Sequence, residues 1–382
     1  MARLIATSTA PPRPPFDRAQ AARRVGIVSL TVTVLLCALA LSRYGALDFA
    51  RMGEMFCCGS PTGSSGYDGQ FALYIAAFGA NATPFIDGPT LRYQRILYPV
   101  TARALALGNP GWAAYTLIAV NVIAHAVGAG LLGYLLGAVG KTHGIAVQRR
   151  LPWMALAFTF WFGGLIAVRL DLNEPLCMAL ALGAVVAYLD RRDRLTAALL
   201  ILSTLTKEIG LVFAAGLALH AFFNGERARA VYLLAAPGIA FLAWWGVLYL
   251  TFGTLPTRYP AARNLLPVPF NGLFAESSPV EFAMLVFWLA APTLMLTLAA
   301  AWRLIRHGFS LSGALMLAAG AWVMLMPDVS WVDPAAAYRV AIPLIPCGLL
   351  WMAEHAPRRV HWLFALWLTS LLVALITPGM WF

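Results

Sequence analysis

Long apolar segments recur along this chain from Val25 almost to its last residue, and they limit its fold more than any other feature. The hydrocarbon core of a bilayer needs about 20 apolar residues per helix. Inside a bilayer the protein must pair every backbone polar group itself, so such segments predict helices. Of the 382 residues, 11% are charged, against about a quarter in soluble domains. The sequence therefore predicts an all-α bundle that crosses a membrane several times.

Eleven segments have the composition of candidate spans. They are residues 25–44, 112–139, 151–168, 175–189, 195–206, 209–223, 231–252, 282–304, 311–326, 340–353 and 360–376. The fifth and sixth are short and flank Lys207 and Glu208. These two form either separate spans or one long helix with an ion pair inside the membrane, so ten or eleven spans are the alternatives.

The distribution of basic residues decides between these alternatives. Short cytoplasmic loops carry an excess of Lys and Arg. With eleven spans and a cytoplasmic N-terminus, the cytoplasmic segments hold 17 of the 27 Lys and Arg residues. An ion pair inside hydrocarbon would also cost several kcal/mol. We therefore predict about eleven spans, with Lys207 and Glu208 at the outer end of a helical hairpin. The same distribution accounts for the net charge of +11 without a nucleic-acid partner.

The chain divides into a short tail and one large domain. Residues 1–24 are rich in Pro, Ala and Arg and predict a disordered basic cytoplasmic tail. Residues 25–382 predict a single transmembrane domain. Its longest loop, residues 45–111, lies on the outer side and has an amphipathic helical pattern, so we expect helices that lie in the membrane interface.

The five cysteines predict neither a disulfide framework nor a zinc site. Cys37, Cys177 and Cys347 lie in apolar segments, where cysteine behaves as a small buried hydrophobe. Cys57 and Cys58 are adjacent, and a bond between neighbours strains the backbone. The chain has no CxxC motif and no Cys/His metal spacing.

Most of the unusual polar residues fall on the outer side of the predicted topology. They come from five separate loops, which suggests one shared polar cavity. The candidate site residues are Asp68, Gln70, Arg92, Arg95, Asp171, Asn173, Glu174, Lys207, Glu208, Arg258 and Arg339.

Residue type and spacing indicate the chemistry of this cavity. Arg92 and Arg95 are three apart and share one face if they are helical. Their guanidinium groups offer paired donors to a phosphate. Asp171 and Glu174 have the same spacing, and a nearby carboxylate can act as a general base toward a hydroxyl.

Each candidate also has a structural interpretation. Asp68-Gly69 is a turn signal, and the two arginines can anchor at lipid headgroups. Asp171 or Asn173 can cap the next helix, which has Pro175 in its first turn.

The order of these motifs resembles the GT-C superfamily of polyprenyl-phosphate-sugar-dependent glycosyltransferases. Tyr67-Asp68-Gly69-Gln70 followed by the Arg92–Pro99 segment is similar to a set of bacterial GT-C-like membrane proteins, and Asn173–Pro175 and Thr206–Glu208 resemble later motifs of the family. The resemblance covers roughly residues 25–225. It implies that Asp68 is the base that deprotonates the acceptor, and that Arg92, Arg95 and Lys207 are among the phosphate-binding positions.

The resemblance implies an inverting glycosyltransferase of the bacterial inner (plasma) membrane, with its active site on the extracytoplasmic face. Its partners would be a polyprenyl-phosphate-linked sugar, a lipid or glycan acceptor, and membrane lipids. Arg258 or Arg339 would assist at the phosphate, and Asp171 and Glu174 would orient the acceptor or a divalent metal, a requirement left open. The alternatives are a lipid or solute transporter or flippase, and a non-catalytic protein that retains the fold.

Overall fold

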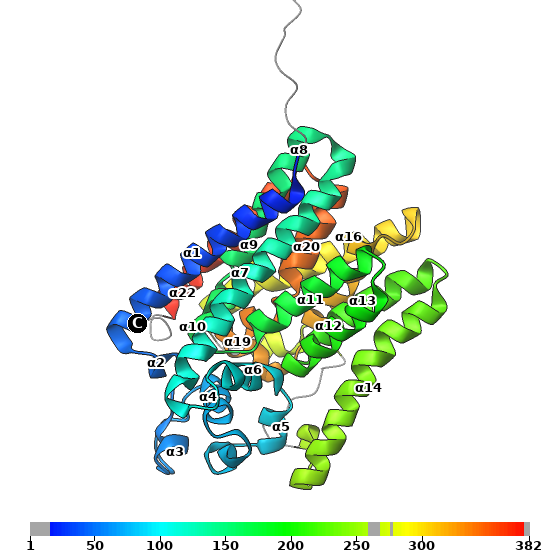
Figure 1. Cartoon of the computed structure of the whole chain (residues 1–382). Coiled ribbons are helices and arrows are strands. Elements are labelled where there is room, and N and C mark those ends of the chain that lie inside the picture. The colour runs from blue at the N-terminus through cyan, green and yellow to red at the C-terminus, as the bar shows by residue number, and fades with distance from the viewer. Residues whose placement is uncertain (1–15, 259–267, 276–277, 378–382) are drawn as a thin grey trace, which may run out of the picture.

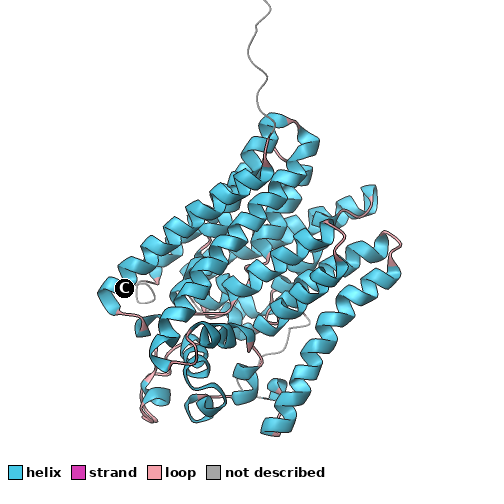
Figure 2. Cartoon of the chain, in the orientation of Figure 1, coloured by secondary structure: helices cyan, strands magenta, loops and turns pink. Residues whose placement is uncertain are grey.

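The computed structural model describes residues 16–258, 268–275 and 278–377, and these residues form helices joined by turns, without a strand (Figures 1 and 2). This confirms the all-α prediction. Residues 1–15 of the predicted tail lie outside the described residues. The first helix begins at Arg18, seven residues before the predicted span, because the Asp17 carboxylate accepts hydrogen bonds from the first-turn N–H groups of Ala19 and Gln20.

The first half of the chain contains one long helix, a group of short helices, and a second long helix. Its elements are α1 (Arg18–Tyr44), α2 (Leu47–Ala50), α3 (Glu54–Cys57), α4 (Gly69–Phe78), η1 (Gly79–Phe85), α5 (Pro89–Tyr93), α6 (Leu97–Leu105), η2 (Pro110–Trp112), α7 (Ala113–Val139), η3 (Gly140–His143), α8 (Ile145–Arg150), η4 (Leu151–Ala155), α9 (Leu156–Thr159) and α10 (Phe162–Arg169).

The second half consists mainly of helices of intermediate length. Its elements are α11 (Glu174–Leu189), α12 (Asp193–Thr206), α13 (Gly210–Phe223), α14 (Arg227–Phe252), η5 (Pro256–Arg258), η6 (Asn271–Ala275), α15 (Pro279–Leu285), the π-helical turn η7 (Val286–Ala290), α16 (Ala291–His307), α17 (Leu311–Met324), α18 (Asp328–Trp331), α19 (Pro334–Val340), α20 (Leu344–His355), α21 (Val360–Leu368), η8 (Thr369–Leu372) and α22 (Val373–Ile376).

Four helices are long and apolar enough to cross a membrane, or six if each of two bent pairs counts as one span. The bent pairs are 145–159 with 162–169, at 50°, and 334–340 with 344–355, at 48°. The chain is therefore a multi-pass membrane protein by the length and composition of its helices, but the prediction of about eleven spans is wrong.

Helix length explains this difference. Hydropathy identifies apolar residues, but a straight helix that crosses the hydrocarbon core needs about 20 of them. The predicted spans at 175–189, 195–206, 209–223 and 311–326 form helices of 16, 14, 14 and 14 residues. The predicted span at 151–168 breaks near Trp161 and bends.

Small residues bring the two long N-terminal helices close together. α1 packs along α7, and an added Cβ on Gly26 would lie 3.4 Å from the Ala126 carbonyl oxygen. An added Cβ on Gly130 would lie 3.3 Å from the Ala22 carbonyl oxygen. Such small-residue contacts are how helices approach each other in membranes. This pair forms one side of the bundle (Figure 1).

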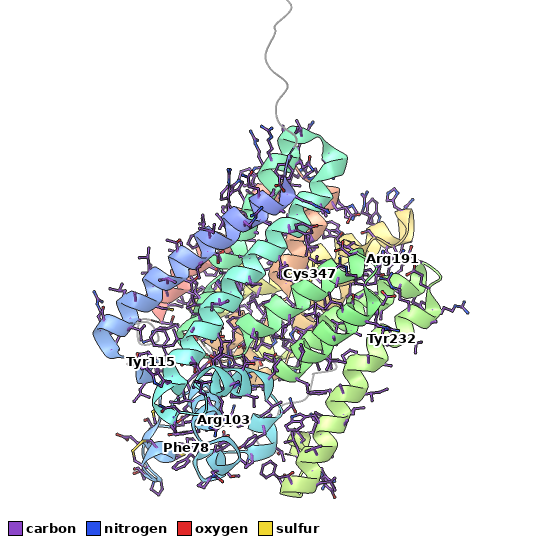
Figure 3. All side chains as sticks on the ribbon, viewed as in Figure 1. Phe78, Arg103, Tyr115, Arg191, Tyr232 and Cys347 are labelled. Atoms are coloured by element: carbon purple, nitrogen blue, oxygen red, sulfur yellow. A yellow bond between two sulfur atoms is a disulfide. The ribbon has the colours of Figure 1, made fainter. Side chains whose placement is uncertain are left out.

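The segment around Lys207 and Glu208 forms the predicted hairpin. α12 ends just before Lys207. α13 then runs back beside α12, so that it ends at the end of the bundle where α12 begins. After α13 the chain is back beside the start of α12, because Arg229 in the first turn of α14 forms an ion pair with Asp193, the first residue of α12, at 2.8 Å. The alternative of one long helix is therefore excluded. Figure 3 labels Arg191 at this far end and Arg103, from the loop helices, at the opposite end.

The predicted outer loop, residues 45–111, folds into α2–α6 with η1 and η2, and together they cover one end of the bundle (Figure 1). Val100, Leu105 and Leu107 are exposed on and after α6, although their position in a membrane interface stays a prediction. One expectation is wrong, because Cys57 and Cys58 form a disulfide at the end of α3. A bond between these neighbours is possible because α3 is a single turn, so that no longer helix constrains the backbone at Cys57 and Cys58.

Candidate functional site

A cavity of about 520 Å³ opens at the end of the bundle that carries the loop helices. One wall is charged and consists of Asp68, Arg92, Arg95, Lys207, Glu208 and Arg339. The other walls are largely aromatic and apolar, and they include Leu91, Phe241, Trp245, Trp322 and Val340. The cavity therefore suits a ligand with one anionic part and one apolar part.

Asp68 lies at the centre of the charged wall, where it joins two arginines that are distant in sequence. Its Oδ1 accepts a hydrogen bond from Arg92 Nη1 at 2.8 Å, and its Oδ2 accepts one from Arg339 Nη2 at 2.9 Å. The second guanidinium nitrogen of Arg339 contacts Glu174 at 3.3 Å. Glu174, fully buried, also accepts from Lys207 Nζ. These contacts link five predicted site residues in one chain of ion pairs.

The glycine after Asp68 positions this carboxylate. An added Cβ on Gly69 would lie 2.1 Å from the carbonyl oxygen of Leu170. A side chain at this position therefore cannot fit without moving backbone. The close approach brings the start of α4 against the segment between α10 and α11, just before Glu174, which begins α11. The Asp-Gly pair thus has a structural role and also places Asp68 in the cavity wall.

A partner carboxylate holds each of the two loop arginines. Asp87 accepts from Arg92 Nε and Nη2, both at 2.7 Å. Glu208 accepts from Arg95 Nη2 at 2.7 Å and from Nε at 3.1 Å. Such two-point pairs fix the plane of the guanidinium as well as its position. α5 ends at Tyr93, so the two arginines do not share one helix, but both still reach the same wall.

The surrounding charges shift the pKa values of the site. Burial by itself would raise the pKa of Asp68, but Arg92 and Arg339 outweigh burial and hold this pKa well below its usual range. In the same way Arg95 overcomes burial and lowers the pKa of Glu208 to about 2. Burial lowers the pKa of the Lys207 ammonium, and Glu174 partly opposes that shift. The carboxylates of Asp68 and Glu208 are therefore ionised, and neither has a strong affinity for a proton in this arrangement.

Besides the buried Glu174, four predicted site residues do not line the large cavity. Gln70 holds the loop instead: it accepts from Gly53 N at 2.9 Å and donates to the Ser65 carbonyl at 2.7 Å. Asn173 donates to the carbonyl of Thr206 at 3.1 Å, which ties α11 to the hairpin. The exposed Arg258 ends η5 outside the cavity, although the two residues before it line the wall.

Asp171 is the fourth of these residues, and it does not share a helix face with Glu174. It precedes α11 in the left-handed region, at φ 51°, and its side chain is fully buried. Its electrostatic neighbours are the Tyr98 hydroxyl and the Arg169 guanidinium. The helix-face argument was wrong here because it assumed that residues 171–174 were helical.

The sequence interpretation missed the partners that hold the site together. Asp87 clamps Arg92, and Asp333 accepts from the Tyr67 hydroxyl at 2.9 Å. Trp245 and Trp322 form aromatic walls of the cavity. An acid five residues before an arginine was an available signal for Asp87. The two tryptophans had none, because they resemble any aromatic residue in an apolar helix.

Among the described residues, no group of three or more His, Cys, Asp or Glu side chains is arranged to hold a metal ion. The acids of the charged wall are instead paired with arginine or lysine. Comparison with protein-family models, with curated proteins and with solved structures finds no match to this chain.

Proposed function

We propose that this chain is a GT-C-like membrane glycosyltransferase that transfers a sugar from a polyprenyl-phosphate donor to a lipid or glycan acceptor. The observation that carries the proposal is the shared cavity wall, where Asp68 lies between the guanidinium groups of Arg92 and Arg339, with Arg95 and Lys207 beside them. Four cations and one central carboxylate from separate segments are suited to a phosphate leaving group and an acceptor hydroxyl.

The apolar walls support a lipid-linked donor. Phe241 and Trp245 come from α14 and Trp322 from α17, and α13 packs against both of these helices. A prenyl chain would lie against these aromatic side chains, while its phosphate would reach the arginines at the opposite wall. Burial of apolar surface would supply most of the affinity, and the charged wall would fix the orientation.

The proposed reaction is a single displacement. The acceptor oxygen attacks the anomeric carbon of the sugar and transfers its proton to Asp68. The bond between that carbon and the phosphate oxygen breaks, and polyprenyl phosphate leaves with the electron pair, so the anomeric configuration inverts. Arg92, Arg95, Lys207 and Arg339 would stabilise the charge that develops on the leaving phosphate, usually the largest contribution to such a reaction.

Two observations support an extracytoplasmic site. The disulfide between Cys57 and Cys58 lies in the loop helices at the same end of the bundle, and disulfides persist in oxidising compartments. Basic residues gather at the far end, where Arg191 and Arg229 pair with Glu226. An excess of basic residues is typical of the cytoplasmic side. We therefore place the N-terminus in the cytoplasm of a bacterial inner membrane.

The direct test is sugar transfer by Asp68→Asn in membranes that receive a radiolabelled polyprenyl-phosphate sugar. The substitution keeps the size of the side chain but removes its charge and its capacity to accept a proton. We expect transfer to fall by roughly 10²-fold or more. Asp193→Asn is the matched control, because Asp193 pairs with Arg229 at the far end, and we expect it to retain transfer. Full transfer by Asp68→Asn would contradict the proposal.

A transporter or lipid flippase is the second candidate, because two helix pairs are bent by 50° and 48° at short breaks. Broken helices of this kind surround the substrate sites of many transporters. Vesicles that contain the purified chain separate the two candidates: an enzyme produces a glycosylated acceptor, whereas a flippase moves the labelled lipid between leaflets without changing it.

A further inference from the structure

Every cation in the charged wall is already paired with a carboxylate. Arg92 pairs with Asp68 and Asp87, and Arg95 pairs with Glu208. The remaining pairs are those of Lys207 with Glu174 and of Arg339 with both Asp68 and Glu174. Four cations therefore face four carboxylates, and the group is neutral. An incoming phosphate must compete with carboxylates for these donors, since guanidinium groups bind both anions in the same geometry.

Burial distinguishes Glu174 from the two carboxylates that line the large cavity, Asp68 and Glu208. The Glu174 side chain is fully buried, whereas those of Asp68 and Glu208 are 29% and 26% exposed. Both exposed carboxylates line the large cavity, and Glu174 does not. A carboxylate at the cavity surface can turn into water, which replaces its lost hydrogen bonds, while the phosphate takes its place at the arginine. Moving Glu174 would leave Lys207 and Arg339 buried without a partner, which is a much larger cost.

We propose that a lipid-linked phosphate binds here by displacing Asp68 and Glu208 from their arginines, while Glu174 remains in place and positions Lys207 and Arg339. The inference rests on the proposed function for the identity of the ligand. It assigns two roles within the site. Asp68 and Glu208 pair with the arginines when no phosphate is bound, and Glu174 is a positioning residue.

This exchange couples the leaving group to the base. When the donor phosphate binds, it takes the place of the Asp68 carboxylate at Arg92 and Arg339. Each arginine that leaves removes a positive charge that had stabilised the ionised carboxylate. Asp68 therefore gains affinity for a proton before the acceptor hydroxyl must lose one. The tight pairing of Asp68 in the empty site is thus compatible with its proposed role as the base.

Binding of farnesyl phosphate to the purified, detergent-solubilised full chain tests the exchange. Farnesyl phosphate imitates the leaving group, and its affinity can be measured by isothermal titration calorimetry without any turnover. Asp68→Asn removes the competing charge, so we expect it to bind farnesyl phosphate roughly tenfold more tightly than the wild type. We expect Glu208→Gln to bind it more tightly as well, because Arg95 is released.

The control is Asp333→Asn. Asp333 lines the same cavity, but its partner is the Tyr67 hydroxyl rather than a cation, and asparagine can still cap α19. We expect its affinity for farnesyl phosphate to stay within about threefold of wild type, since no cation is released. Farnesol, which lacks the phosphate, should bind all of the variants equally.

The possible outcomes separate this inference from the proposed function. Unchanged or weaker binding of farnesyl phosphate by an Asp68→Asn protein that melts like wild type would overturn the exchange, and so would the absence of binding by both proteins. Tighter binding without any sugar transfer by wild type would support the exchange and contradict the transferase. Sugar transfer by wild type together with unchanged binding in Asp68→Asn would support the transferase and contradict the exchange.

Discussion

The buried pair of Lys207 and Glu174 gives the most demanding prediction about stability. Glu174 is fully buried, and Lys207 is nearly so. The glutamate accepts from the lysine and, at 3.3 Å, from Arg339. Removing one partner of a buried pair leaves an uncompensated charge and typically costs about 3–5 kcal/mol. Lys207→Met should lie at the lower end of that range because Arg339 still contacts Glu174. Glu174→Gln should lie at the upper end because it leaves Lys207 without its partner.

The double variant Lys207→Met/Glu174→Gln removes both charges and should recover a large part of the loss, since neither charge remains unpaired. The measurement is the thermal midpoint of the purified protein in detergent, where each single variant should melt on the order of 10 °C below wild type.

Arg191→Met is the control for this cycle. The Arg191 side chain is 67% exposed in its pair with Glu226 at the far end, and exposed ion pairs contribute about 1 kcal/mol or less. Its midpoint should stay close to that of wild type. Single variants at Lys207 and Glu174 that melt like this control, or a double variant whose loss equals the sum of the single losses, would refute the buried pair.

Three further predictions concern the loop and the charged wall. Gln70→Ala removes two hydrogen bonds that hold the outer loop, so it should cost about 1–3 kcal/mol of stability in thermal unfolding, and a midpoint equal to wild type would contradict that role. The pKa of Glu208 is lowered to about 2 by Arg95, so the stability from this pair should be complete above about pH 5 and should fall as pH decreases toward 2. Unfolding midpoints that already fall between pH 7 and 5 in wild type, but not in Glu208→Gln, would disagree with this sign. Alkylation of the denatured protein should label two more cysteines after reduction than before it, and equal labelling would disprove the bond between Cys57 and Cys58.

The tertiary structure gave several sequence motifs a meaning that spacing did not supply. Asp171 and Glu174 have helical spacing, but Asp171 itself has a left-handed backbone and lies outside the helix that begins at Glu174. Arg92 and Arg95 lie on different segments and still converge, because Asp87 and Glu208 each fix one guanidinium. Such pairings form between residues that are distant in sequence, and the identity of one residue does not indicate its partner.

The count of membrane spans shows the same limit. Hydropathy correctly identified the apolar segments, and the hairpin at Lys207 was predicted from the distribution of basic residues and from the cost of burying a charged pair. Hydropathy did not predict that several helices end after 14 to 16 residues or bend near Trp161. Helix length and bending depend on neighbouring helices, because a short helix can end inside the bundle only where other helices shield its end from lipid.

The recurrent apolar segments alone determined that this chain is an all-α membrane protein, because a chain with so few charged residues cannot cover itself with a solvated surface. They also placed most of its unusual polar residues at one end. The tertiary structure alone decided that Asp68 lies between Arg92 and Arg339, and that Gln70 and Asp171 lie elsewhere. Burial is a property of single residues and leaves a pattern in the sequence. A salt bridge between segments about 270 residues apart depends on the packing of the whole bundle.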